Sequence, residues 1–124
     1  TETTVEKDTL FLTEKIYKPI MIGHPFVVWG NPGTLEYLRK EGYQTFPELF
    51  DESYDTEEDC AERLKKIIEI CKTTPIKDWT QETIEKIEHN KQHFYNRWKT
   101  KLLTMNNNVV ESLLSLPNDT NQTK

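Results

Sequence analysis

Apolar residues in this chain occur in blocks whose spacing predicts both strands and helices. The clearest block is residues 25–29, a continuous apolar run of the kind found in a strand buried on both faces of a parallel sheet. A short apolar run at residues 10–12 precedes it, and a weaker strand or irregular segment at 43–50 follows it. The pattern therefore predicts a small number of buried strands separated by helical segments.

The first helix is expected to begin at Thr13, which is a good N-cap, with Glu14 placed favourably for the helix dipole. Pro19 lies about six residues into this segment, where it removes a backbone hydrogen bond and should kink the helix. Gly23 is a plausible stop. The residues expected to face the core are Ile16 and Ile20.

Further helices are predicted along the rest of the chain, the first of them a short one over residues 34–40, ended by Gly42. A second helix, with Thr56 as its N-cap, is expected over 57–72, with its apolar stripe at Ala61, Leu64, Ile67, Ile68 and Cys71. A long helix follows over about 80–103, with Ile84, Ile87, Phe94, Trp98 and Leu102 on one face. The three asparagines at 106–108 are expected to interrupt it, and residues 109–116 to form a final short helix.

Strands that alternate with helices indicate βαβ units and a parallel sheet. The predicted fold class is therefore α/β, a partial Rossmann-like domain with a small parallel sheet and a long C-terminal helical extension. The expected boundaries are 1–78 for the Rossmann-like region, incomplete at its N-terminus, 79–116 for the helical extension and 117–124 for a disordered polar tail. The shortage of strands and the missing initial Met suggest a fragment of a longer protein.

Composition and charge narrow the function classes. The 124 residues include 16 basic and 21 acidic ones, for a net charge of −5, which argues against a nucleic-acid partner. No apolar run reaches the roughly 18 residues of a membrane span, and no signal peptide is visible. Cys60 and Cys71 lie roughly 16 Å apart on one predicted helix, too far for a disulfide. Reduced thiols indicate a cytoplasmic location.

Two segments follow predicted strands, where open α/β sheets bind their ligands. In the first, the helix N-terminus at Thr13 and the charge of Lys15 suit a phosphate, and Glu14 can accept hydrogen bonds from ribose hydroxyls. The alternative is that Glu14 complements the helix dipole and Lys15 is solvated. Both readings stay open at this point.

The second segment is the turn at residues 30–33. Gly30 and Gly33 would let the backbone approach a ligand closely, with Asn31 between them. The alternative is an ordinary turn in which Asn31 caps the next helix and Pro32 occupies its first position.

Metal and nucleophile chemistry is less well supported. Asp51, Glu52 and Asp55 could hold Mg²⁺ for a phosphohydrolase, or form a solvated loop that caps the next helix. His89 and His93 have a metal-capable spacing but lack the His-Glu-x-x-His zinc motif. No Ser–His–Asp or Cys–His pattern is visible. We therefore assign no metal site, no catalytic residue and no cofactor.

The motif Phe-Leu-Thr-Glu-Lys-Ile-Tyr-Lys at 11–18, followed by Gly23 and Pro-Phe-Val-Val-Trp-Gly at 25–30, resembles the donor-binding segment of α1,3-fucosyltransferases. The stretch from about 10 to 72 is also similar to a group of uncharacterised viral and environmental proteins. Their shared features are Thr-Glu-Lys with Lys-Pro-Ile, His-Pro-Phe, Pro-Gly with Tyr-Leu, and Asp-Glu-Ser-Tyr-Asp.

This resemblance implies the C-terminal half of a GT-B glycosyltransferase, which binds a nucleotide diphosphate sugar such as a GDP-sugar and transfers the sugar to a glycan or other hydroxyl acceptor. Glu14 would contact the ribose, Lys15 the diphosphate, and Lys18 matches a basic residue of the family. The chain departs from the family at 19–20, where Pro-Ile replaces Asn-Ala. The implied donor-binding residues are Thr13, Glu14, Lys15, Lys18, Gly30, Asn31 and Gly33. The catalytic base belongs to a missing N-terminal domain, so this chain alone should be inactive.

The alternative function is a non-enzymatic interaction module. Its long C-terminal helix would dock a protein partner, or a second copy in a homo-oligomer, through Ile87, Phe94 and Trp98. This reading is motivated by apolar surface that a small sheet would not cover.

Overall fold

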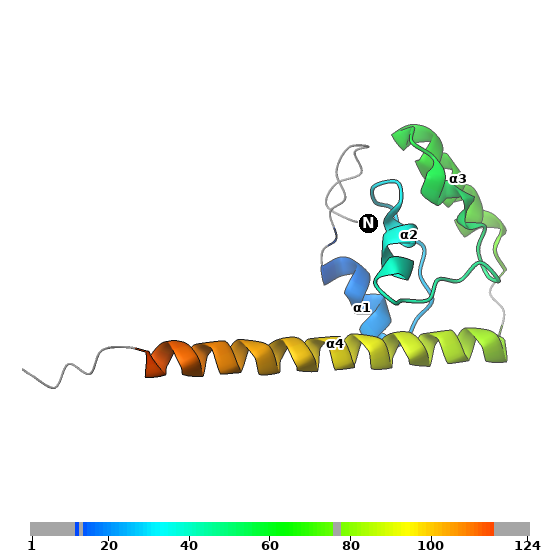
Figure 1. Cartoon of the computed structure of the whole chain (residues 1–124). Helices are drawn as coiled ribbons and strands as arrows, with labels where there is room; N and C mark the ends of the chain where they lie inside the picture. The colour runs from blue at the N-terminus through cyan, green and yellow to red at the C-terminus, as the bar shows by residue number, and fades with distance from the viewer. Residues whose placement is uncertain (1–11, 13, 76–77, 116–124) are drawn as a thin grey trace, which may run out of the picture. The chain divides into compact units, whose positions relative to one another are not determined.

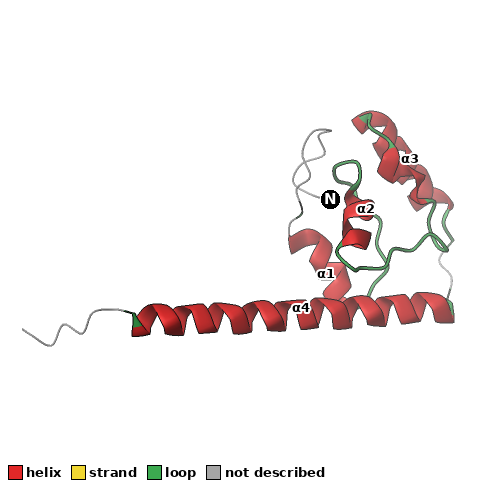
Figure 2. Ribbon diagram, in the orientation of Figure 1, coloured by secondary structure: helices red, strands yellow, loops and turns green. Residues whose placement is uncertain are grey.

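The computed structural model describes residues 12, 14–75 and 78–115 (Figure 1). The elements are α1 (Glu14–Ile22), α2 (Thr34–Lys40), the 3₁₀ helix η1 (Glu52–Thr56), α3 (Cys60–Thr73) and α4 (Gln81–Leu114). Figure 2 shows helices joined by loops, and none of the described residues lies in a strand. These residues form two compact units, an N-terminal unit that ends at Phe94 and a C-terminal unit that begins at Tyr95.

The first predicted helix is confirmed as α1. Ile16 and Ile20 are buried in the core, as expected from their spacing, and Pro19 is accommodated inside the helix. Gly23 follows the last helical residue with a φ of 77°, a left-handed conformation that glycine adopts without steric cost. The predicted cap, Thr13, lies outside the described residues.

The strand predicted at residues 25–29 is wrong, although the segment is buried. Phe26 and Val28 are buried and Val27 is half-buried, so alternate residues face the core as in a strand. The backbone, however, bonds to side chains from distant segments. The Val28 N–H donates to Tyr54 Oη at 3.1 Å, and the Gly30 carbonyl accepts from Arg63 Nε at 3.0 Å. These side chains satisfy backbone groups that a neighbouring strand would otherwise bind.

The weaker segment at 43–50 is irregular for the same reason. The side-chain amide of Asn90 on α4 accepts from the Gln44 N–H at 2.7 Å and donates to the Gln44 carbonyl at 2.9 Å. The Phe46 N–H donates to Glu52 Oε1 at 2.7 Å. With no sheet in the described part of the chain, the predicted α/β class, a partial Rossmann-like domain with a parallel sheet, is wrong.

One apolar core lies in the N-terminal unit, and α1, α2, α3, the first turns of α4 and the loops all contribute to it. Phe26 and Phe46 meet edge to face in it, with ring centroids 5.3 Å apart. Its buried members are Ile16, Ile20, Phe26, Val28, Leu35, Leu38, Tyr43, Phe46, Tyr54, Ile67, Ile70 and Ile87.

The helix predicted at 57–72 exists as α3, but its cap and buried face differ from the prediction. Asp59, not Thr56, caps it by accepting from the Glu62 N–H at 2.8 Å. The buried residues are Arg63, Ile67 and Ile70, whereas Leu64 and Ile68 of the predicted stripe are exposed. The break expected at 106–108 is absent, because α4 is one continuous helix.

Candidate functional site

The predicted donor-binding residues lie in two places. Glu14, Lys15 and Lys18 are exposed on α1, and Thr13 lies outside the described residues. Residues 30–33 form the loop that leads into α2. A donor-binding role for these residues stays a prediction.

The turn at 30–33 is held by the chain itself. Gly33 has a φ of 80°, and its N–H donates to the Asp55 carbonyl at 2.8 Å. The Asp55 carboxylate accepts from the N–H groups of Leu35 and Glu36, at 2.9 and 3.1 Å. Asn31 is buried, so its side chain is not presented to solvent. A carboxylate of the chain therefore already binds the N-terminus of α2. The alternative in which Asn31 caps the helix and Pro32 occupies its first position is wrong, because the N-cap is Gly33 and α2 begins at Thr34.

The acidic residues after Phe50 serve similar structural roles. Asp51 accepts from the Ser53 N–H at 2.9 Å, and Glu52 forms an ion pair with Arg39. Asp55 is buried beneath α2. In the described part of the chain, no group of three or more His, Cys, Asp or Glu side chains is arranged to hold a metal ion. These carboxylates therefore cap helices and join loops.

His89 and His93 bind backbone carbonyls at the end of α2. His93 Nε2 lies 2.7 Å from the Glu41 carbonyl oxygen, and His89 Nε2 lies 2.9 Å from that of Gly42. The two imidazole rings stack with their centroids 5.9 Å apart. Each Nε2–H donates to a backbone carbonyl, that of the C-cap residue Glu41 or of Gly42 after it, so the pair fastens α4 to the end of α2.

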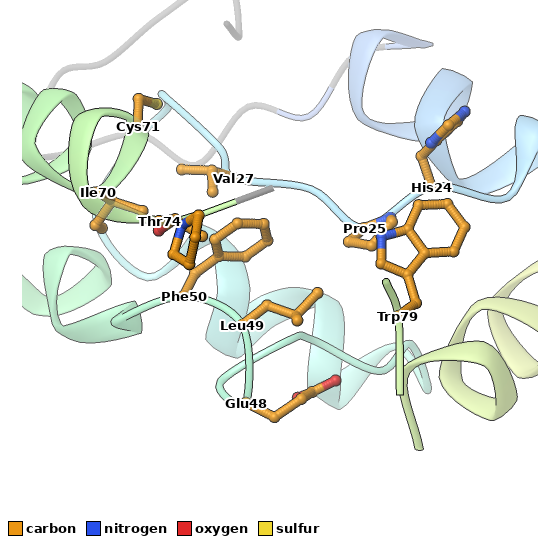
Figure 3. A pocket seen from close by; sticks show the side chains of 11 residues that line it. His24, Pro25, Val27, Glu48, Leu49, Phe50, Ile70, Cys71, Thr74 and Trp79 are labelled. Carbon is orange, nitrogen blue, oxygen red and sulfur yellow. The ribbon is translucent and has the colours of Figure 1, made fainter. Parts of the chain in front are cut away.

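A cavity of about 480 Å³ lies in the N-terminal unit (Figure 3). Of its polar side chains, Glu48 pairs with Lys86 at 2.7 Å, and the His24 ring packs edge to face against Trp79 in the cavity wall. Figure 3 shows Cys71 and His24 at opposite ends of the cavity, so they form no thiol–imidazole pair. The lining residues are His24, Pro25, Val27, Glu48, Leu49, Phe50, Ile70, Cys71, Thr74, Pro75 and Trp79. None of the predicted donor-binding residues is among them.

The C-terminal unit carries the most extensive exposed apolar surface of α4. Six large side chains recur on it at intervals of three or four residues, each between 42% and 62% exposed. This spacing places them on one face of a helix. We call them the α4 stripe: Tyr95, Trp98, Leu102, Met105, Val109 and Leu113. Trp98 and Leu102 were predicted on the apolar face of the long helix, and Val109 and Leu113 fall in the final helix predicted at 109–116. The prediction that Ile87 and Phe94 dock a partner together with Trp98 is wrong, because Ile87 lies in the core of the N-terminal unit and Phe94 packs against it.

Charge is distributed unevenly along the same unit. Arg97, Lys99 and Lys101 lie in its N-terminal part, and Glu111 lies near its C-terminal end. The Lys101 ammonium lies 5.1 Å from the ring centroid of Trp98, where it adds a cation–π contact. The α4 stripe is thus bordered by cations at one end and by a carboxylate at the other.

No family model matches the chain, and the curated proteins and solved structures compared with it include no significant match. The predicted relation to GT-B glycosyltransferases, and to α1,3-fucosyltransferases within them, is wrong. A Rossmann-like domain requires a parallel sheet, and the described residues are helices and loops. None of the described helices is long and apolar enough to cross a membrane.

Proposed function

We propose that this protein is a non-enzymatic interaction module in which the α4 stripe docks on the same stripe of a second copy. The observation that carries the proposal is the row of six exposed apolar side chains on one face of α4. Contiguous exposed apolar surface of this kind marks protein interaction sites. Intervals of three and four residues are those by which two helices interlock their side chains.

The amino-acid composition of α4 supports the proposal that another helix covers the α4 stripe. Residues 106–108 are asparagines and 109–110 are valines, each about 0.5–0.7 kcal/mol less favourable in a helix than alanine. Over these five positions the helix loses about 3 kcal/mol relative to alanine. Burying one Leu or Met side chain contributes about 1.5–3 kcal/mol, so packing the stripe against another helix offsets that loss.

We propose a second copy of the chain as the partner, because each copy carries the same surface. A two-fold pair uses the same patch on both partners, and every copy carries the complete stripe. The patch also contains both charge signs, with cations at residues 97, 99 and 101 and a carboxylate at residue 111. The stripe itself therefore offers a second copy apolar complementarity, while these charges lie beside it.

The test is the molar mass in solution, measured by light scattering and sedimentation over a wide concentration series. We expect a reversible dimer. Leu102→Asp should abolish it by placing a carboxylate in the apolar contact of both copies. The matched control is Thr104→Asp, an exposed position about 200° around the helix from Leu102, which should leave the dimer intact.

Both substitutions lie outside the core of the N-terminal unit, so its thermal unfolding serves as a check that the variants are folded. A wild-type chain that stays monomeric at every concentration would contradict the proposal. A Leu102→Asp dimer as tight as that of wild type would contradict it equally.

A further inference from the structure

The cavity in the N-terminal unit is formed by segments that lie far apart in the sequence (Figure 3). Residues 24–27 follow α1, residues 48–50 precede η1, residues between 70 and 75 lie at the end of α3 and just after it, and Trp79 precedes α4. The volume of about 480 Å³ falls in the range of about 300–1,000 Å³ that is typical of small-molecule sites. None of the described lining residues belongs to the α4 stripe, so the cavity is a separate candidate for binding.

The walls of this cavity are mainly apolar. Ile70 is buried, and Val27 and Leu49 are half-buried. Pro25 and Pro75 also line the cavity, and because proline has no backbone N–H, these two positions offer a ligand no main-chain donor. Water between such walls finds few hydrogen-bond partners, so an apolar ligand that displaces it gains affinity.

Two aromatic side chains in the lining favour a ligand with a flat ring. Phe50 is half-buried, whereas the Trp79 indole is 42% exposed although it lines the cavity. Figure 3 shows these two rings on either side of Leu49. Aromatic rings attract one another when their centroids are about 4.5–7 Å apart, and a planar ligand can lie against an aromatic wall with a whole face or edge. The exposed indole leaves room for such a contact.

The carboxylate in the described lining already has partners. Glu48 Oε2 accepts from Lys86 Nζ at 2.7 Å, and Glu48 Oε1 accepts from the Thr83 hydroxyl at 3.1 Å. The His24 ring packs against Trp79, and Figure 3 shows it turned away from the centre of the cavity. A charged ligand would therefore lose its water without gaining an opposite charge, which is costly. The lining favours a neutral ligand.

We infer that the N-terminal unit binds a small, neutral, planar aromatic molecule in this cavity, with the ring of the ligand against Trp79 and Phe50. Such a ligand fits the volume of the cavity, displaces water from its apolar walls and needs no charged partner. This inference goes beyond the proposed self-association and does not depend on it, because the cavity and the α4 stripe belong to different units.

The first test compares four probes by titration calorimetry at neutral pH, namely 2-naphthol, 2-naphthoate, 2-naphthylmethylammonium and 1-octanol. The three naphthalene probes share one flat ring system and are neutral, anionic and cationic, whereas 1-octanol is neutral but not planar. We expect 2-naphthol to bind about tenfold or more tightly than each of the others. Equal affinity for a charged probe or for 1-octanol overturns the assigned ligand class, and no binding of 2-naphthol overturns the site itself.

Trp79→Ala and Trp98→Ala form a matched pair, since each removes an indole that is 42% exposed, the first from the cavity wall and the second from the α4 stripe. Trp79→Ala should weaken the binding of 2-naphthol about tenfold or more and leave the molar mass of the protein as in wild type. Trp98→Ala should leave the affinity for 2-naphthol unchanged. Equal losses in both variants indicate binding to exposed indoles in general and overturn the inference, as does an unchanged affinity in Trp79→Ala.

The indole N–H signals in magnetic resonance spectra of wild type give a test that needs no truncated side chain. The chain has 3 tryptophans, and a Phe substitution at each one assigns its signal. We expect 2-naphthol to shift the Trp79 signal and to leave the Trp98 signal in place. A shift of the Trp98 signal without one of the Trp79 signal overturns the inference, while the proposed self-association is still judged by the molar mass alone.

Discussion

Tyr54→Phe tests whether a side chain replaces a neighbouring strand in this fold. Tyr54 is 2% exposed, and its hydroxyl accepts the hydrogen bond from the Val28 N–H at 3.1 Å. Phenylalanine keeps the ring and its packing but leaves that buried N–H without its acceptor. An unsatisfied buried donor costs about 1–3 kcal/mol. At about 4–8 °C per kcal/mol for a unit of this size, the melting temperature should fall by about 5–20 °C.

The assay is urea unfolding followed by circular dichroism. We expect a lower midpoint with an unchanged slope, which reports a loss of stability without a change in the surface exposed on unfolding. The control is Tyr37→Phe, the same chemical change at an exposed position of α2, which should alter stability by less than about 0.5 kcal/mol. If both variants were equally stable, the Tyr54 hydroxyl would not hold the extended segment.

Wild type and Tyr54→Phe should also differ in how their stability depends on pH. Burial, and secondarily the nearby carboxylates, raise the pKa of Tyr54 well above its ordinary value of 10.0. The neutral phenol is therefore favoured in the folded state, so its contribution is complete below pH 10 and is lost as the pH rises further. Wild type should lose up to about 1.4 kcal/mol per pH unit through this group, whereas Tyr54→Phe does not. The stability gap should narrow above pH 10, and a constant gap would contradict the assignment.

Two further predictions concern the loops. A Cβ on Gly42 would lie 2.8 Å from the His93 ring, whereas one on Gly33 would meet nothing within 4 Å, although both residues have positive φ. In urea unfolding, Gly33→Ala should lower the stability by about 1–2 kcal/mol from backbone strain alone. Gly42→Ala should lower it by more, because its Cβ also clashes with the His93 ring. Equal losses in the two variants would argue against that clash. Partial burial alone would raise the pKa of Glu48, but the hydrogen bond from Lys86 holds it below its ordinary 4.5. That stabilisation is present above about pH 5 and is lost in acid. Glu48→Gln should therefore reduce the stability that the protein loses between neutral and acidic pH by about 0.5 kcal/mol. An unchanged dependence of stability on acidic pH would exclude this role.

Local patterns in the sequence predicted local features correctly. The burial of Ile16 and Ile20 in α1 follows from their spacing, and the stop at Gly23 follows from its freedom at positive φ. The break expected at 106–108 was wrong because asparagine disfavours a helix only weakly, and the α4 stripe extends through that segment.

The run at 25–29 has the same burial pattern as a strand, so its apolar pattern could not predict that the described residues form no sheet. The groups that satisfy its backbone lie far away in the sequence, at Tyr54 and Arg63, and those that satisfy Gln44 lie at Asn90. In a sequence pattern, arginine and asparagine are expected at the surface, and tyrosine is found both at the surface and in the core. Only their burial identifies them as substitutes for a strand, and burial is a property of the whole fold.

The two units therefore use their side chains in opposite ways. In the N-terminal unit the buried polar groups hold the backbone, as Asp55 does at α2, Arg63 at Gly30 and Asn90 at Gln44. Groups committed to internal hydrogen bonds are poor candidates for chemistry on a substrate, because using them would leave buried backbone groups unsatisfied. In the C-terminal unit the helix exposes apolar side chains and contains weak helix formers. If covering the stripe supplies its stability, then pairing and helix formation beyond residue 104 are one linked equilibrium, and the helix gains stability by mass action as the chain becomes more concentrated.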